Sequence, residues 1–250
     1  MPSQKLSPQS ATLHTALVIL AKAPIPGQVK TRLCPPLTPD EAATLHGSFV
    51  LDTLERTKAA LTTFKLPFDR YLACAPSSTH VFFKVLEERQ GVRLMDQVGD
   101  DLGARMNQAF DTLFAQGYKS GVIVGTDTPS LPLERYQQTF SALESHDLVL
   151  GPALDGGYYL IGLNRPIPGL FTGIPWSTDQ VLALTQEKAG ALGLKTALLE
   201  SWRDIDTISD LEALIEASVL DTKKSKREQS FSSRTAGALQ LLAKRLRTRA

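Results

Sequence analysis

The sequence predicts an α/β fold in which a mostly parallel sheet has helices on both faces and includes a late antiparallel hairpin. Short apolar runs alternate with stretches of helical periodicity, and continuous apolar runs are typical of strands covered on both faces. Two further apolar runs, at 147–151 and 158–163, flank Asp155-Gly156-Gly157. An Asp-Gly pair between two strands indicates a tight hairpin turn, so the parallel pattern is interrupted there.

The first helix follows a strand at 16–22 with the sequence ALVILAK. Thr38 and Glu41 have the spacing of a capping box, and Pro39 stands at the first helical position. The apolar positions that then share one helical face are Ala43, Val50, Leu54 and Leu61. The next expected elements, in chain order, are a strand at 68–75, a helix at 79–88, a strand at 92–95, a helix at 101–116, a strand at 121–125 and a helix at 132–143.

The hairpin is followed by a third group of elements. Ser177 and Gln180 have the spacing of a second capping box, before a helix that ends near Gly190. Thr207 and Asp210 have a similar spacing at the start of the last helix of the body. We expect a strand at 194–198 and that last helix at 207–219.

Composition limits the class of protein. We expect a disordered lead-in at 1–14, one domain at 15–220, and a basic linker with an amphipathic tail at 221–250. The last 30 residues carry nine Lys or Arg and two acids, which leaves 18 bases and 24 acids in the first 220 residues, a net charge of −6. An acidic body argues against nucleic-acid binding by the fold. With no signal peptide, no transmembrane segment and two isolated cysteines, the sequence predicts a cytoplasmic protein.

The tail has several possible roles. Leu239, Leu242 and Leu246 would share one face of a helix with basic residues around it. Such a helix can make a peripheral contact with an anionic membrane, or it can dock on an acidic partner or on the acidic body of this chain; the alternative is a solvated, frayed terminus. We expect 223–234 to be a flexible linker and truncation after Leu220 to leave the fold intact.

Polar clusters follow several strands, at the edge of the sheet where open α/β folds bind ligands. Lys22, Lys30 and Arg32 lie in the loop after the first strand and suit a phosphate-rich ligand, although a solvated basic loop is the alternative. Asp127 follows the strand at 121–125, where it can hold a divalent cation or cap a turn. Asp206, with Asp204, can either complete a metal site or cap the last helix.

Three more features bear on the site. Residues 97–103 precede a helix whose free N–H groups favour anions, although Asp100 or Asp101 can act as the N-cap. Trp176 can stack on a ring or simply pack. The histidines His14, His46, His80 and His146 lie in unrelated contexts, which argues against a histidine-based metal or acid–base site.

Six segments together resemble one family, the bacterial GT-A-type glycosyltransferases of the arsenosugar-biosynthesis-like group. The segments are KAPIPGQVKTRL (22–33), GDDLGARM (99–106), GTDTPSL (125–131), GPALDGGYYLIG (151–162), WS (176–177) and DIDT (204–207). They occur in order over 16–216. The resemblance implies the nucleotide-diphospho-sugar transferase fold and transfer of a sugar from a nucleotide diphosphate donor to a small-molecule acceptor, with a divalent cation (Mg²⁺ or Mn²⁺).

The resemblance also implies roles for individual residues. The nucleotide and its phosphates would meet Lys22, Lys30, Arg32, Asp101 and Arg105. The metal would bind Asp127 and Asp206, the base would be Asp155, and the acceptor side would hold Gly156, Gly157, Tyr158 and Trp176. GT-A enzymes often carry Asp-x-Asp, whereas Thr128 and Pro129 follow Asp127 here. Two alternatives remain: a nucleotidyltransferase of the 2-phospholactate guanylyltransferase type, and a non-catalytic nucleotide-binding regulator.

Overall fold

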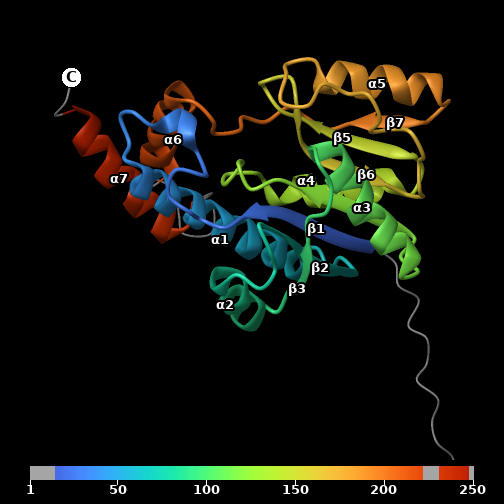
Figure 1. Ribbon diagram of the computed structural model, residues 1–250, viewed down its shortest axis with the longest axis horizontal. Helices are drawn as coiled ribbons and strands as arrows, with labels where there is room; N and C mark the ends of the chain where they lie inside the picture. The colour runs from blue at the N-terminus through green and yellow to red at the C-terminus, as the bar shows by residue number, and fades with distance from the viewer. Residues whose placement is uncertain (1–14, 222–230, 248–250) are drawn as a thin grey trace, which may run out of the picture.

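A seven-stranded sheet runs through the computed structural model, which describes residues 15–221 and 231–247 (Figure 1). The strands are β1 (Thr15–Lys22), β2 (Phe68–Ala75), β3 (Arg93–Asp96), β4 (Ser120–Val124), β5 (Leu148–Pro152), β6 (Tyr158–Leu163) and β7 (Thr196–Leu198). Their order is β3-β2-β1-β4-β6-β5-β7. Among these strands only β6 runs antiparallel to its neighbours, β4 and β5. The predicted α/β fold class, with its late hairpin, is confirmed.

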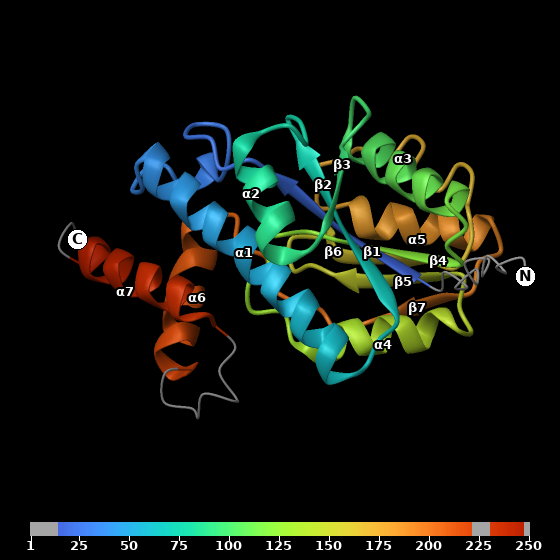
Figure 2. The ribbon, with the colours of Figure 1, turned by 90° about the horizontal axis from the view of Figure 1, so that it is seen from below.

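Helices cover both faces of the sheet (Figure 2). In chain order the helical elements are the 3₁₀ turn η1 (Thr31–Leu33) and the α-helices α1 (Pro39–Thr63), α2 (Val81–Gln90), α3 (Leu102–Ala115), α4 (Leu133–Leu143), α5 (Val181–Ala191), α6 (Ile208–Asp221) and α7 (Ser233–Arg247). In β1, Leu17 and Ile19 face a core shared with α1, α2 and α4. Ala16 and Val18 face the opposite core, shared with α3 and α5. This alternation explains why β1 is continuously apolar from Ala16 to Ala21.

Two of the three predicted capping boxes form. Thr38 and Glu41 exchange hydrogen bonds at the start of α1, from Thr38 N to Glu41 Oε2 (2.8 Å) and from Glu41 N to Thr38 Oγ1 (3.3 Å). Thr207 and Asp210 form the equivalent pair at the start of α6, from Thr207 N to Asp210 Oδ2 (2.9 Å) and from Asp210 N to Thr207 Oγ1 (3.3 Å). The predicted box at Ser177 and Gln180 is wrong: Ser177 has a left-handed φ of 66°, and Gln180 is the N-cap without a side-chain cap bond. The left-handed residue turns the chain, so Ser177 lies outside the helix.

The C-terminal helix lies on the body of the same chain. Leu239 and Leu242 of α7 are buried in a cluster with residues of α1 and α6, which include Phe49 and Leu211 (Figures 1 and 2). Arg234 pairs with Asp52 of α1 at 2.9 Å. Of the alternatives for the tail, the structure therefore shows docking on the acidic body. Because these contacts are buried, we expect truncation after Leu220 to destabilise the fold, which reverses the expectation from the sequence.

The remaining boundary predictions are resolved only in part. The helix α7 begins inside the expected linker at 223–234, while 222–230 and the expected lead-in at 1–14 lie outside the described residues. In the part of the chain that the structure describes, no helix is both long and apolar enough to cross a membrane. The division of the chain at residue 220 and the cytoplasmic location stay predictions.

The packing of Trp176 against α3 fixes one rim of the sheet edge. A Cβ placed on Gly103 would lie 2.4 Å from Cζ2 of the Trp176 ring, so the indole occupies the space of a side chain at the first turn of α3. On its other side the ring lies near Phe171, with ring centroids 6.3 Å apart. The glycine is therefore required by this close approach, and the loop that begins at Trp176 is held next to α3.

The docking of α7 can be tested with two leucines of that helix. Leu239 is 1% exposed and Leu241 is 70% exposed. We expect Leu239→Ala to lower the free energy of unfolding by about 2–5 kcal/mol, because it leaves a cavity in the α1–α6–α7 cluster. Leu241→Ala should change it by no more than about 0.5 kcal/mol. Urea unfolding measures both, and equal effects of the two substitutions would show that α7 is not part of the folded core.

The seat of Trp176 can be tested with two helical glycines. We expect Gly103→Ala to displace Trp176, which should shift the tryptophan emission to longer wavelength and lower the melting temperature. Gly237 of α7 has no atom within 4 Å of a Cβ placed on it. Gly237→Ala should therefore stabilise the helix by about 0.5–1 kcal/mol and leave the emission unchanged. Both are measured in a Trp202→Phe background, and an unchanged spectrum in Gly103→Ala contradicts the predicted displacement.

Candidate functional site

The predicted site residues meet in one cleft at the carboxyl ends of β1 and β4. The cleft has a volume of about 830 Å³. Because β6 is antiparallel, the turn between β5 and β6 reaches the same edge of the sheet. Of the predicted site residues all but Gly156 line the cleft: Lys22, Lys30, Arg32, Asp101, Arg105, Asp127, Asp155, Gly157, Tyr158, Trp176 and Asp206.

Lys30 lies at the bottom of the cleft between two acids. Its ammonium is 2.6 Å from Asp127 Oδ1 and 2.7 Å from Asp206 Oδ1. It also donates a hydrogen bond of 2.6 Å to the backbone oxygen of Ile205. The Lys30 side chain is 4% exposed, whereas Asp127 is 42% and Asp206 35% exposed. The sequence assigned Lys30 to phosphates and the two acids to a metal, and in this structure the three bind one another.

The charges of these groups stabilise one another. Burial alone would lower the pKa of Lys30, but the negative charges of Asp127 and Asp206 outweigh it, so the pKa is raised. Burial alone would raise the pKa of Asp127, but the charge of Lys30 and its hydrogen bond lower it. Lys30 therefore stays cationic and Asp127 stays anionic near neutral pH.

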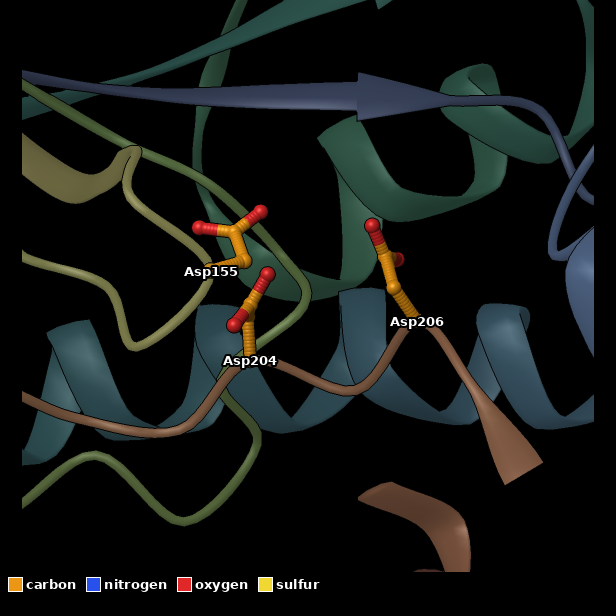
Figure 3. A group of neighbouring side chains, drawn as sticks. All are labelled: Asp155, Asp204 and Asp206. Atoms are coloured by element: carbon orange, nitrogen blue, oxygen red, sulfur yellow. The ribbon is translucent and has the colours of Figure 1, made fainter. Parts of the chain in front are cut away.

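Asp206 also belongs to a second group of acids, with Asp155 and Asp204. One carboxylate oxygen from each of Asp155, Asp204 and Asp206 lies within 4.8 Å of the others. Figure 3 shows Asp155 on the turn after β5, facing Asp204, while Asp206 lies further along the segment that leads to α6. Burial raises the pKa of Asp204 to about 7, with a further contribution from the charge of Asp155. Within this group Asp206 is paired with Lys30, whereas Asp204 is buried beside a second carboxylate.

The turn that carries Asp155 depends on glycine. Gly156 has a φ of +91°, and a Cβ there would lie 2.1 Å from the backbone oxygen of Asp179. Gly157 N donates a 2.9 Å hydrogen bond to Asp155 Oδ1, which orients that carboxylate. Gly156 thus shapes the turn from outside the cleft. Tyr158 lines the cleft, and burial raises the pKa of its hydroxyl.

The cleft is also lined by cations and by the start of α3. Asp101 caps α3 by accepting a 2.7 Å hydrogen bond from Ala104 N, which is the structural alternative that the sequence offered. Arg105 Nε donates to Gly99 O at 3.0 Å. Lys22 is exposed, and Arg32 is 68% exposed with Nη1 3.9 Å from Asp206 Oδ2. Roles for these residues toward a nucleotide stay predictions.

Two lining residues were missed by the sequence analysis. His46 is buried, and its Nε2 lies 3.0 Å from the backbone oxygen of Lys22. A carbonyl can only accept, so Nε2 carries the proton, and Nδ1 is a buried acceptor without a hydrogen-bond partner among the described residues. Burial lowers the pKa of His46 and keeps it neutral. The sequence does contain a signal that His46 is buried. This residue lies three positions after Ala43 and four before Val50, on the apolar face of α1.

Gln97 is the second missed residue. Its Nε2 donates to Ala21 O at 3.0 Å and to Ala73 O at 2.8 Å. Both N–H groups of the amide are therefore used by the ends of β1 and β2, which fixes the side chain at the cleft. No sequence pattern signals such a bond, because its acceptors are backbone atoms of strands far along the chain.

Comparisons with known proteins agree with this geometry. Residues 59–178 match the family described as "uncharacterized protein conserved in bacteria" (DUF2064). The crystal structure of a candidate nucleotide-diphospho-sugar transferase from Desulfovibrio desulfuricans G20 is 32% identical, with a TM-score of 0.81 over 94% of this chain and 98% of that chain. No curated protein sequence is significantly similar.

More distant structures share the fold alone. A cytidylyltransferase from Leptospira borgpetersenii serovar Hardjo-bovis (strain JB197) is 16% identical, with a TM-score of 0.54 over 93% of this chain and 95% of that one. A CMP:2-keto-3-deoxy-manno-octonic acid synthetase complexed with CTP is 11% identical, with a TM-score of 0.53 over 84% and 100%. Given the 32% identity to the Desulfovibrio protein over nearly the full length of both chains, this chain belongs to the bacterial nucleotide-diphospho-sugar transferase superfamily.

Proposed function

We propose that this protein transfers a sugar from a nucleotide diphosphate donor to a small-molecule acceptor. The observation that supports this most is that cations and carboxylates line the same cleft. The cations are Lys22, Arg32 and Arg105, and the carboxylates include Asp155 and Asp204. A diphosphate needs cations along its length, while a sugar and an acceptor hydroxyl are bound and activated by carboxylates.

The cations that line the cleft suit the departing diphosphate. Negative charge builds up on the diphosphate as the bond to the sugar breaks, so fixed cations there stabilise the transition state more than the bound substrate. Arg32 is the best placed for this role, because its exposed guanidinium can bind two phosphate oxygens at once. Lys22 and Arg105 line the same cleft and would add positive charge near the diphosphate.

The acidic residues fit a divalent cation. Asp155, Asp204 and Asp206 offer carboxylate oxygens within 4.8 Å of one another, and carboxylates are the ligands that Mg²⁺ and Mn²⁺ prefer. Asp127 adds a further carboxylate beside Asp206 across Lys30. When bound, such a cation would neutralise the diphosphate as it leaves.

The acceptor side is the part of the cleft around the β5–β6 turn. Asp155 is the most exposed acid of the three and is oriented by Gly157 N, so it is placed to take the proton of an acceptor hydroxyl. Tyr158 and Trp176 line the same part of the cleft and would flank the acceptor.

Nucleotidyl transfer is the second candidate. The cytidylyltransferase and the CTP-bound synthetase named above have the same fold. Thr128 and Pro129 also follow Asp127, so the segment after β4 lacks the Asp-x-Asp common in GT-A enzymes. The two reactions differ in the bond that breaks: sugar transfer releases a nucleoside diphosphate, and nucleotidyl transfer releases pyrophosphate.

The proposal is tested by following both products. We expect release of a nucleoside diphosphate from one of the UDP, GDP, ADP, CDP or dTDP sugars, stimulated by Mn²⁺ and by an acceptor. Asp206→Asn should abolish the Mn²⁺-dependent gain in donor affinity, because it removes a charge that both acidic groups share. Release of pyrophosphate from a nucleoside triphosphate would establish the second candidate. Binding without either product would establish a non-catalytic regulator.

The role of Arg32 is tested by nucleotide affinity. We expect Arg32→Ala to weaken binding of the nucleotide diphosphate by about 1.5–3 kcal/mol, the range for hydrogen bonds to charged groups. Arg89→Ala is the control, because Arg89 is also exposed but lies on α2 and does not line the cleft. Titration calorimetry measures both. Unchanged affinity in a folded Arg32→Ala protein would exclude Arg32 from the phosphate site.

A further inference from the structure

The ammonium of Lys30 is surrounded by three oxygen atoms. It donates hydrogen bonds to Asp206 Oδ1 at 2.7 Å and to Ile205 O at 2.6 Å. Asp127 Oδ1 lies 2.6 Å from the same nitrogen as an ion pair. The side chain is also 4% exposed, so a phosphate in the cleft does not reach it. In this arrangement Lys30 cannot bind the phosphates to which the sequence assigns it.

The same ammonium occupies the oxygens that a divalent cation needs. Asp127 and Asp206 are both partly exposed to the cleft, but Oδ1 of each is already paired with Lys30. Asp206 also belongs to the group with Asp155 and Asp204. Lys30 therefore competes with a divalent cation for Asp206. This holds whether the other ligands come from Asp127 or from Asp155 and Asp204.

We infer that Lys30 changes partners when the nucleotide binds. Its ammonium leaves Asp127 and Asp206 for the phosphates, and the two freed carboxylates then bind a divalent cation. This inference rests on the proposed function, because it requires a phosphate ligand in the cleft. It makes the binding of cation and nucleotide cooperative, since each favours the state in which Lys30 is released.

The charge balance supports such an exchange. Lys30 with Asp127 and Asp206 has a net charge of −1, so the pair of acids is only half compensated. A divalent cation in place of the ammonium compensates both carboxylates, and the ammonium then compensates one phosphate charge. The buried ammonium has an anionic partner in both states, and the two carboxylates are better compensated in the second state.

The local backbone is consistent with two states. Lys30 has a left-handed φ of 49°, which is unfavourable for a residue with a Cβ. It precedes η1 in the loop after β1, and the side chain has four flexible methylene groups. The ion pairs hold this strained residue in place, and the long side chain can turn toward the cleft without moving β1.

The test uses Mn²⁺ alone, without any nucleotide, and measures its affinity by electron paramagnetic resonance. We expect Lys30→Met to bind Mn²⁺ about tenfold to a hundredfold tighter than the wild type, because two carboxylate oxygens become available. The double variant Lys30→Met with Asp206→Asn should lose this gain. Equal affinity of Lys30→Met and the wild type, or a gain that survives Asp206→Asn, would overturn the inference.

A matched control separates occupancy from simple charge. Arg32 Nη1 lies 3.9 Å from Asp206 Oδ2 but is exposed, so Arg32→Met removes a nearby positive charge without freeing an occupied oxygen. Its gain in Mn²⁺ affinity should be less than about fivefold. A gain as large as that of Lys30→Met would show that the effect is electrostatic only and would also overturn the inference.

Folding of the variant is controlled separately. If Lys30→Met is unstable because two acids lose their cation, Mn²⁺ should raise its melting temperature more than that of the wild type, and Lys30→Gln provides a second variant with a polar side chain. Absence of this extra stabilisation in both variants contradicts the inference. Failure of every nucleotide and sugar nucleotide to bind the wild type would instead contradict the proposed function.

Discussion

The buried ammonium of Lys30 joins three parts of the chain that are distant in sequence. It connects the loop after β1 with the end of β4 at Asp127 and with the segment before α6 at Asp206. A backbone hydrogen bond of 2.9 Å from Ile205 N to Asp127 O joins the segment after β4 directly to the segment before α6. A buried cation is costly unless it is paired, so each of the three segments fixes the others. The positions of Asp127 and Asp206 in the cleft depend on this arrangement.

The order of the strands explains why acids from different segments gather here. β1 and β4 are adjacent and parallel, so the loops that follow them meet at one edge of the sheet. The insertion of the antiparallel β6 between β4 and β5 brings the turn with Asp155 to the same edge. The chain then passes this edge again between β7 and α6, where Asp204 and Asp206 lie.

Much of the fold could be predicted from the sequence because the signals are local. β1 is covered on both faces and is apolar from Ala16 to Ala21, and the Thr38–Glu41 box lies within one helical turn. Features that depend on distant residues could not be predicted. Arg234 pairs with Asp52 across 182 residues, so the docking of α7 has no local signal. The left-handed Ser177 is likewise fixed by the packing of its loop.

The site shows the same limit for chemically similar residues. Lys30 and Arg32 are two residues apart in one basic loop, yet their side chains are 4% and 68% exposed. Both residues were predicted to have the same role, since a sequence reveals only that they follow a strand. The difference between them follows from their shapes: a compact ammonium fits among three oxygens at 2.6–2.7 Å, whereas a planar guanidinium is too wide for that space and is better suited to phosphate in the open cleft. Residue type and burial together, and neither alone, therefore distinguish the cation that organises the site from the cation that faces the ligand.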